Sequence, residues 1–212
     1  MAFVLLANAA QEGNSTATTS AIDTTGADLI VCVIGYDLVG DVTADVTDSA
    51  SNTWSVAGIG STTTTRTASI FFCQAPTTSA THTFTMTGMF VSIAVLAFSG
   101  VCGRVDAITR NIGSSVTSLA PGSITPTLDG ELLVTGLCLP TTATASIDAG
   151  FTISDQVGGT TGQFVGAAYL IQTSAAAANP SWSFSSNTGA AIMAGFTLAT
   201  PATAAGGAWA SA

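Results

Sequence analysis

Hydrophobic and polar residues alternate along much of this chain in the period-two pattern of β-strands. The stretch HTFTMT (82–87) places its histidine, phenylalanine and methionine on one face and its threonines on the other. Three other runs, at 27–36, 68–75 and 91–100, are apolar at nearly every position. Such runs are typical of strands that are covered on both faces. Helical spacing of apolar residues is not seen over any dozen positions, so the pattern predicts an all-β protein.

An internal repeat with an offset of about 100 residues organises these strands. Three pairs of segments carry the repeat: 26–36 with 129–139, 71–85 with 169–185, and 91–100 with 190–199. Within the second pair we match Gln74 with Gln172 and Phe84 with Phe184. The expected strands therefore follow the same order in both halves.

Two architectures fit this repeat: a single sandwich to which each half contributes strands, or two tandem immunoglobulin-like sandwiches. The link at 100–118 still has the composition of a strand, and it parallels the N-terminal stretch 3–20. We therefore expect a single jelly-roll-like antiparallel β-sandwich over residues 1–200. Its halves would span about 1–100 and 101–200, followed by an Ala/Gly-rich C-terminal arm at 201–212.

The opening stretch MAFVLLANAAQEG could be a secretion signal or the first strand of the fold. A signal needs a basic start and an apolar core of roughly 7–15 residues. Here no Lys or Arg precedes Arg66, and the apolar core runs only from Phe3 to Leu6. We expect a strand, and a protein made in the cytoplasm without a signal peptide.

The charge composition narrows the possible partners. Only 7% of the 212 residues are charged; there is no lysine, and the formal net charge is -9. The three cations, Arg66, Arg104 and Arg110, are too few and too dispersed to bind nucleic acid or an anionic membrane surface. No apolar run reaches the roughly 18 residues of a spanning helix. Hydroxyl residues take the place of charge, with 35 Thr and 22 Ser.

One cluster of carboxylates is a candidate calcium loop. Calcium binds carboxylates and carbonyls in loops, but the D-x-D-x-D-G spacing is missing here, so a solvated acidic loop is favoured. No metal and no cofactor is expected. The cluster lies between two apolar runs and consists of Asp37, Asp41, Asp45 and Asp48.

Nucleophilic chemistry has few candidates. A Ser/His/Asp triad would have to use His82, the single histidine, and no G-x-S-x-G motif accompanies it. We interpret His82 as a structural strand residue and expect no catalytic residues and no enzymatic activity.

The cysteines lack metal-ligand spacing, and buried free thiols are favoured over disulfides. They are Cys32, Cys73, Cys102 and Cys138.

Aromatic residues leave a glycan-binding module open as an alternative. Exposed indole or phenol rings on a sandwich face can stack on sugars, although core packing is favoured for Trp54 and Trp182. The available rings are Trp54, Trp182, Trp209, Tyr36 and Tyr169.

Long uncharged stretches point to assembly. No charged residue follows Asp155, and only Arg66 is charged from 49 to 103. Sheet edges are normally protected by charge, especially Lys, so part of this surface is expected to be buried against other subunits. Pro201 and Trp209 of the arm are the candidate assembly contacts.

Four segments resemble a family of Thr/Ala-rich, jelly-roll-like β-sandwich structural proteins of tailed phages and bacterial genomes, whose members are mostly uncharacterised. The segments are DTTGADL (23–29), VTDSASNTW (46–54), APTTSATHTFT (75–85) and SIAVLAFSGV (92–101). The resemblance implies a non-enzymatic virion protein, chiefly a capsid decoration (cement) protein, that forms homo-oligomers and contacts capsid or tail proteins. The alternative is a glycan-binding module of a tail fibre, spike or secreted protein.

Overall fold

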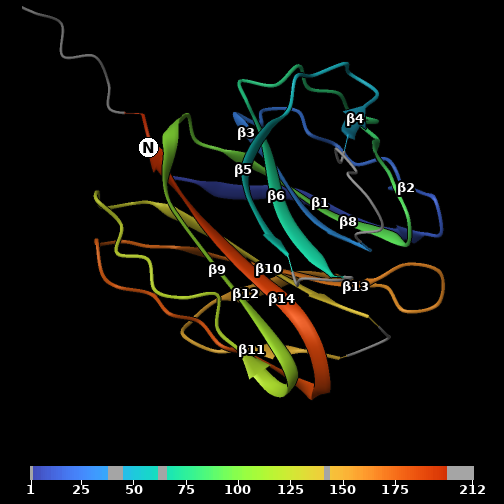
Figure 1. Ribbon diagram of the computed structural model, residues 1–212. Coiled ribbons are helices and arrows are strands. Elements are labelled where there is room, and N and C mark those ends of the chain that lie inside the picture. Colours follow the sequence, from blue (N-terminus) through green and yellow to red (C-terminus); the bar gives the residue numbers. More distant parts are fainter. Residues whose placement is uncertain (1, 38–44, 62–65, 141–143, 200–212) are drawn as a thin grey trace, which may run out of the picture.

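A computed structural model describes residues 2–37, 45–61, 66–140 and 144–199 (Figure 1). The side chains of Asp45 and Ser61 are not described. Within these ranges the chain forms fourteen strands, and the pairings between them are antiparallel. The prediction of an all-β sandwich is confirmed.

Two large sheets pack face to face and form the body of the molecule (Figure 1). The first sheet has the order β1-β8-β3-β6-β5. Its strands are β1 (Val4–Gly13), β3 (Leu29–Tyr36), β5 (Ser55–Ser61), β6 (Thr67–Gln74) and β8 (Val91–Ser99). The second sheet has the order β11-β14-β10-β13-β12, with β9 also paired to β14. Its strands are β9 (Cys102–Leu119), β10 (Leu132–Leu139), β11 (Ser146–Ile147), β12 (Thr152–Val157), β13 (Phe164–Ile171) and β14 (Trp182–Leu198).

A small third sheet covers the outer face of the first. It has the order β2-β7-β4 and comprises β2 (Thr16–Thr18), β4 (Asp45–Asp48) and β7 (Phe84–Thr87). In the second half the same three positions are taken by the end of β9, the start of β14 and β11. The long strand β9 therefore corresponds to β1 and β2 of the first half, and the long strand β14 corresponds to β7 and β8.

The strand order of the two large sheets is the same once these equivalences are made. The order β1-β8-β3-β6-β5 of the first half corresponds to β9-β14-β10-β13-β12 of the second. In the face-to-face packing, β1 lies near β12 and β5 lies near β9. The halves are thus related by an approximate two-fold axis, which passes between β3 and β10.

The strands β3, β8 and β10 are buried along almost their whole length because each large sheet has a hydrophobic core on both faces. A central core joins the two sheets and draws on both halves, from Leu29 and Phe98 to Leu132 and Phe196. Separate outer cores lie beneath the small sheet and on the far face of the second sheet. Because these strands face a core on both sides, their sequences are continuous apolar runs.

The strand registers correct the two residue matches made from the repeat. Leu29 pairs with Gln74, whereas its equivalent Leu132 pairs with Ile171, so Gln74 corresponds to Ile171 and not to Gln172. The match of Phe84 with Phe184 is also wrong. Met86 pairs with Ala17 and Val46, and Trp182 pairs with Leu119 and Ile147 in the same way, so the two strands are displaced by four residues from the expected match. The first match is wrong by one residue. The displacement of the second is even and leaves every side chain on its expected face, which is why alternation could not detect it.

Candidate functional site

The carboxylates of the predicted acidic loop do not share one environment in the structure. Asp37 forms an ion pair with Arg66, with Nη1 and Oδ2 3.4 Å apart. Asp48 points inward and its side chain has no exposed area. Asp41 and the side chain of Asp45 lie outside the described residues. The calcium loop as a whole stays a prediction, and two of its four carboxylates are already engaged by protein groups.

Asp48 is the centre of a buried hydrogen-bond network in the first half. Its Oδ1 accepts hydrogen bonds from the backbone N of Ala50 at 2.8 Å and from Nδ2 of Asn52 at 3.2 Å. The same oxygen lies 3.1 Å from Nε2 of His82, and Oδ2 accepts from Nε1 of Trp54 at 2.8 Å. Burial opposes ionisation of Asp48, but these hydrogen bonds outweigh it and hold the pKa of the carboxyl below its ordinary value.

The network continues from His82 to a hydroxyl. Oγ1 of Thr24 lies 2.9 Å from Nδ1 of His82, which gives the sequence hydroxyl, imidazole, carboxylate that hydrolase triads use. Thr24, His82 and Asp48 have no exposed side-chain area, and a nucleophile must reach its substrate. The geometry fits a structural role, in which the three residues tie the 22–24 segment, β4 and the residues before β7 into one unit.

Two buried carboxylates, Asp106 and Glu131, fix a loop to β9. Thr127 donates its backbone N–H to Oδ2 of Asp106 and to Oε1 of Glu131, both at 3.0 Å. Burial works against ionisation of Asp106, yet hydrogen bonds from Thr127 and Arg104 keep its pKa below the ordinary value. Across the described residues, no group of three or more His, Cys, Asp or Glu side chains could hold a metal ion.

The described tryptophans and tyrosines do not form an exposed platform. Trp182 and Tyr36 are fully buried. Trp54 and Tyr169 are half-buried, and the indole nitrogen of Trp54 is bound to Asp48. Core packing accounts for these rings, as expected for Trp54 and Trp182.

All four cysteines are free thiols and all are buried. Burial raises the pKa of each thiol, and for Cys138 it raises the pKa to about 12. A thiol with a raised pKa is a poor nucleophile and a poor metal ligand, so a structural role in the cores is favoured.

The most distinctive surface lies where β5 and β9 run side by side. Each is the last strand of its large sheet among the described strands, so their outer edges are open. Glycines allow the close approach. A Cβ at Gly58 would lie 2.8 Å from Cγ2 of Ile108, and one at Gly60 would lie 3.2 Å from Cβ of Arg110. Arg110 also reaches across the seam and donates from Nη1 to the carbonyl oxygen of Ile59 at 2.7 Å.

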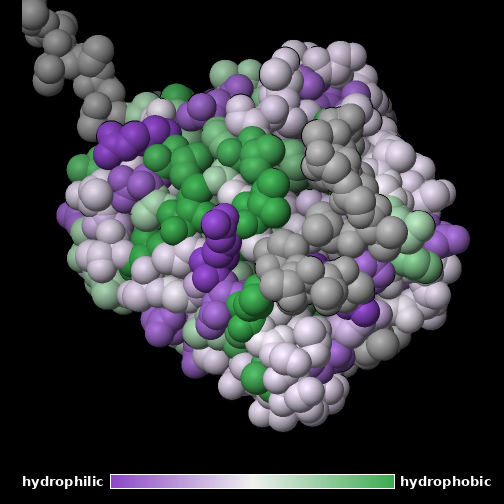
Figure 2. All heavy atoms as spheres, in the orientation of Figure 1, coloured by the Kyte–Doolittle hydropathy of each residue, from purple (hydrophilic) through white to green (hydrophobic). Residues whose placement is uncertain are grey.

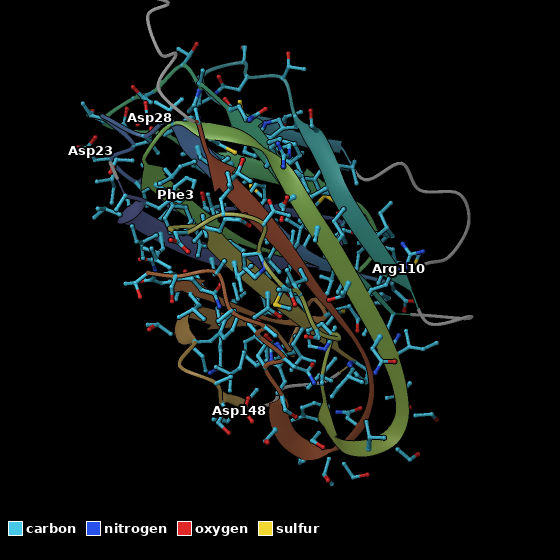
Figure 3. The ribbon with its side chains drawn as sticks, turned by 90° about the vertical axis from the view of Figure 1, so that its left-hand side faces the viewer. Phe3, Asp23, Asp28, Arg110 and Asp148 are labelled. Atoms are coloured by element: carbon cyan, nitrogen blue, oxygen red, sulfur yellow. The ribbon has the colours of Figure 1, made fainter. Side chains whose placement is uncertain are left out.

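Four large aliphatic side chains are exposed along this seam, which we call the open-edge patch. They are Val56, Ile59, Ile108 and Ile112, and they are 50%, 42%, 41% and 46% exposed. Figure 2 shows hydrophobic residues gathered over β5 and β9 in the middle of this face. Arg110 projects at the edge of the sandwich beside β5 (Figure 3). The patch therefore combines aliphatic surface with one guanidinium.

Sequence reasoning did not single out the open-edge patch. Two local patterns belong to it: glycine at every second position in GIG of SVAGIGS (55–61), and Ile108, Arg110 and Ile112 at every second position in AITRNI (107–112). Neither stretch indicates that the two strands are neighbours. The expected contacts Pro201 and Trp209 lie outside the described residues.

Comparison with protein-family models, with curated proteins and with solved structures finds no match to this chain. In the described part of the chain there is no helix with the length and hydropathy needed to cross a membrane.

Proposed function

We propose that this protein is a non-enzymatic structural protein of a virion, a capsid decoration (cement) protein that acts as a homo-oligomer. The observation that supports this most is the open-edge patch on β5 and β9. Four exposed aliphatic side chains lie along the same two strands as Arg110, and β5 carries no charged residue. Protein interfaces share this composition, because their cores are depleted of charge and enriched in arginine and apolar groups.

The edge strand β5 also lacks the side chains that usually protect a sheet edge. Soluble β-proteins place lysine, proline or inward-pointing charge on their edge strands to prevent pairing with other chains. This chain has no lysine, and its edge strand β5 is made of Ser, Val, Ala, Gly and Ile. An uncovered apolar edge favours association, so the proposed mechanism is passive. Neighbouring copies or shell subunits cover the edge and add contacts that resist the internal pressure of a capsid.

The rest of the molecule is compatible with a passive role in a particle. The net charge of -9 opposes binding to nucleic acid, and the buried thiols are shielded from oxidants. Most of the large apolar side chains lie in the three buried cores. The open-edge patch is the main apolar feature of the face shown in Figure 2.

The direct test is the copy number of this protein in purified particles of the virus that carries its gene. Quantitative mass spectrometry should find it in the capsid fraction in many copies, in a simple ratio to the shell subunit. A few copies confined to tails, or its absence from particles, would overturn the decoration role.

Substitutions on the open-edge patch provide a second test. We expect Val56→Lys and Ile112→Lys each to reduce self-association, because lysine is the side chain that natural sheets use to protect an edge. The mass in solution should be measured by sedimentation velocity over a range of protein concentrations. Leu6→Lys is the matched control, since Leu6 is an equally exposed aliphatic residue (43%) on the edge strand β1. An equal loss of association in the control variant would argue against the patch.

The glycan-binding alternative receives no support from the described tryptophans and tyrosines, which are buried or half-buried. We therefore do not propose it as a second function.

A further inference from the structure

A small hollow opens beside the seam, next to the open-edge patch. It has a volume of about 220 Å³ and is lined by Gly60, Arg110, Asn111 and Ile112. Small-molecule sites usually measure roughly 300–1,000 Å³, so this hollow is better suited to one large side chain than to a metabolite. Its lining includes an aliphatic wall, Ile112, and a guanidinium, Arg110.

This lining matches the chemistry of an indole ring. Arginine is the cation that most often lies against an aromatic face, and tryptophan is its best partner. Arg110 is already held by its bond to the Ile59 carbonyl, so little side-chain entropy is lost when a ring packs against it. That bond also occupies a carbonyl of β5, which makes insertion of a side chain more favourable here than addition of a whole strand.

The chain itself carries a suitable ring outside the described residues. Trp209 stands in PATAAGGAWASA (201–212), an uncharged stretch of small residues that can approach a surface closely. We propose that Trp209 of a neighbouring copy occupies the hollow between Gly60 and Ile112. This inference rests on the proposed self-association and names the segment that carries it.

The direction in which the chain leaves the fold indicates that Trp209 comes from a neighbouring copy. Ala199 is held at the start of β9, where its N–H donates to the carbonyl of Val101 at 2.8 Å. Because β14 runs antiparallel to β9, the chain leaves the fold heading away from Ile112. Ten residues of β9 separate Cys102 from Ile112, a span of about 34 Å. Ten fully extended residues span at most about 36 Å from Ala199 to Trp209, and reversing the chain direction uses part of that length. A neighbouring copy is therefore favoured over the chain's own arm.

Disulfide trapping between full-length chains tests the inference. One preparation carries Ile112→Cys and an affinity tag, and the other carries Ala210→Cys without a tag. The natural cysteines are buried, so they should not compete. After mixing and mild oxidation, non-reducing gels should show a mixed dimer. Docking raises the local thiol concentration, so the yield should exceed that of an undocked pair about tenfold or more.

The matched control replaces Ile112→Cys by Leu6→Cys, at an exposed residue of the edge strand β1. Trp209→Ala in the Ala210→Cys chain should lower the mixed-dimer yield to the control level, and Trp209→Phe should restore most of it. Equal yields at the two positions would overturn the inference. A double variant that carries Ile112→Cys and Ala210→Cys tests the donor chain, and a disulfide that forms only within its single chains would also overturn the inference.

The outcome separates this inference from the proposed function. If Ile112→Lys weakens self-association while no mixed dimer exceeds the control, the open-edge patch is an interface but Trp209 is not its occupant. If the wild-type chain is monomeric and absent from particles, the proposed function itself has failed.

Discussion

At the scale of single residues, the two halves of the molecule differ in chemistry at His82. The backbone bridge between Ile22 and His82 has its counterpart in the bridge between Ile124 and Ala178. The first half therefore places an imidazole where the second places a methyl group. The consequence is that the outer core of the first half contains a polar network, centred on Asp48, which must be fully satisfied to be stable.

We expect Asp48→Asn to lower the free energy of unfolding at neutral pH by about 1–3 kcal/mol, because the amide cannot accept all the hydrogen bonds that the carboxylate accepts. The pKa of Asp48 is lowered in the folded state, so its contribution to stability is fully present above the ordinary Asp pKa of about 3.9. It is lost as the pH falls through the folded-state pKa. Urea unfolding at several pH values should show the difference from wild type shrinking in acid.

The control for this prediction is Asp23→Asn. Asp23 also accepts a backbone hydrogen bond, from Thr25 at 2.9 Å, but it is exposed to solvent. Its substitution should change stability much less. A loss as large as that of Asp48→Asn would show that burial of the network is not the cause.

At the scale of secondary-structure elements, the crossing of β3 and β10 decides how closely the two large sheets pack. A Cβ at Gly136 of β10 would collide with Cγ1 of Val33 in β3. Nearby, a Cβ at Gly35 of β3 would lie 3.1 Å from the sulfur of Cys138 in β10. Each strand thus offers a glycine to a larger side chain of the other, on the approximate two-fold axis.

We expect Gly136→Ala to destabilise the protein by about 1–3 kcal/mol, because the added methyl group forces the sheets apart in a close-packed core. Chemical denaturation is the measurement. Gly195→Ala is the control with a milder contact, 3.2 Å from the flexible end of Leu133. Combining Gly136→Ala with Val33→Ala should recover part of the loss. Equal effects of the two glycine substitutions would contradict the sheet-crossing explanation.

At the scale of the whole molecule, the central core makes the two halves depend on each other. Its members come from both large sheets, and neither sheet can cover that face by itself. Hydrogen bonds also join the two halves at the C-terminal end of β1. Glu12 accepts hydrogen bonds from the backbone N–H groups of Thr161 at 3.2 Å and Gly162 at 3.0 Å.

We therefore expect the protein to unfold in a single cooperative transition. Circular dichroism and tryptophan fluorescence should give the same midpoint, and the calorimetric and van't Hoff enthalpies should agree. Asp48→Asn, although confined to the first half, should shift that single transition. Two separate transitions, with only one moved by the substitution, would indicate independently stable halves.

The sequence by itself determined the class of the fold and the facing of many strands. Period-two alternation placed His82, Phe84 and Met86 on one face of a strand, and the structure has all three buried. The repeat indicated that the halves share one strand order, and the expected strand at 100–118 is found as β9. These features depend on local geometry, since side chains alternate along any strand wherever it lies in space.

Only the tertiary structure decided which residues far apart in the sequence meet. The register between repeats, the bond from His82 to Asp48 across 34 residues, and the seam between β5 and β9 all depend on how the sheets pack. A strand pattern is unchanged by an even shift and does not identify the neighbour of an edge strand. The open-edge patch and its hollow arise where two edges from different halves come together. For that reason the candidate site could not be found from the sequence, whereas the fold class could.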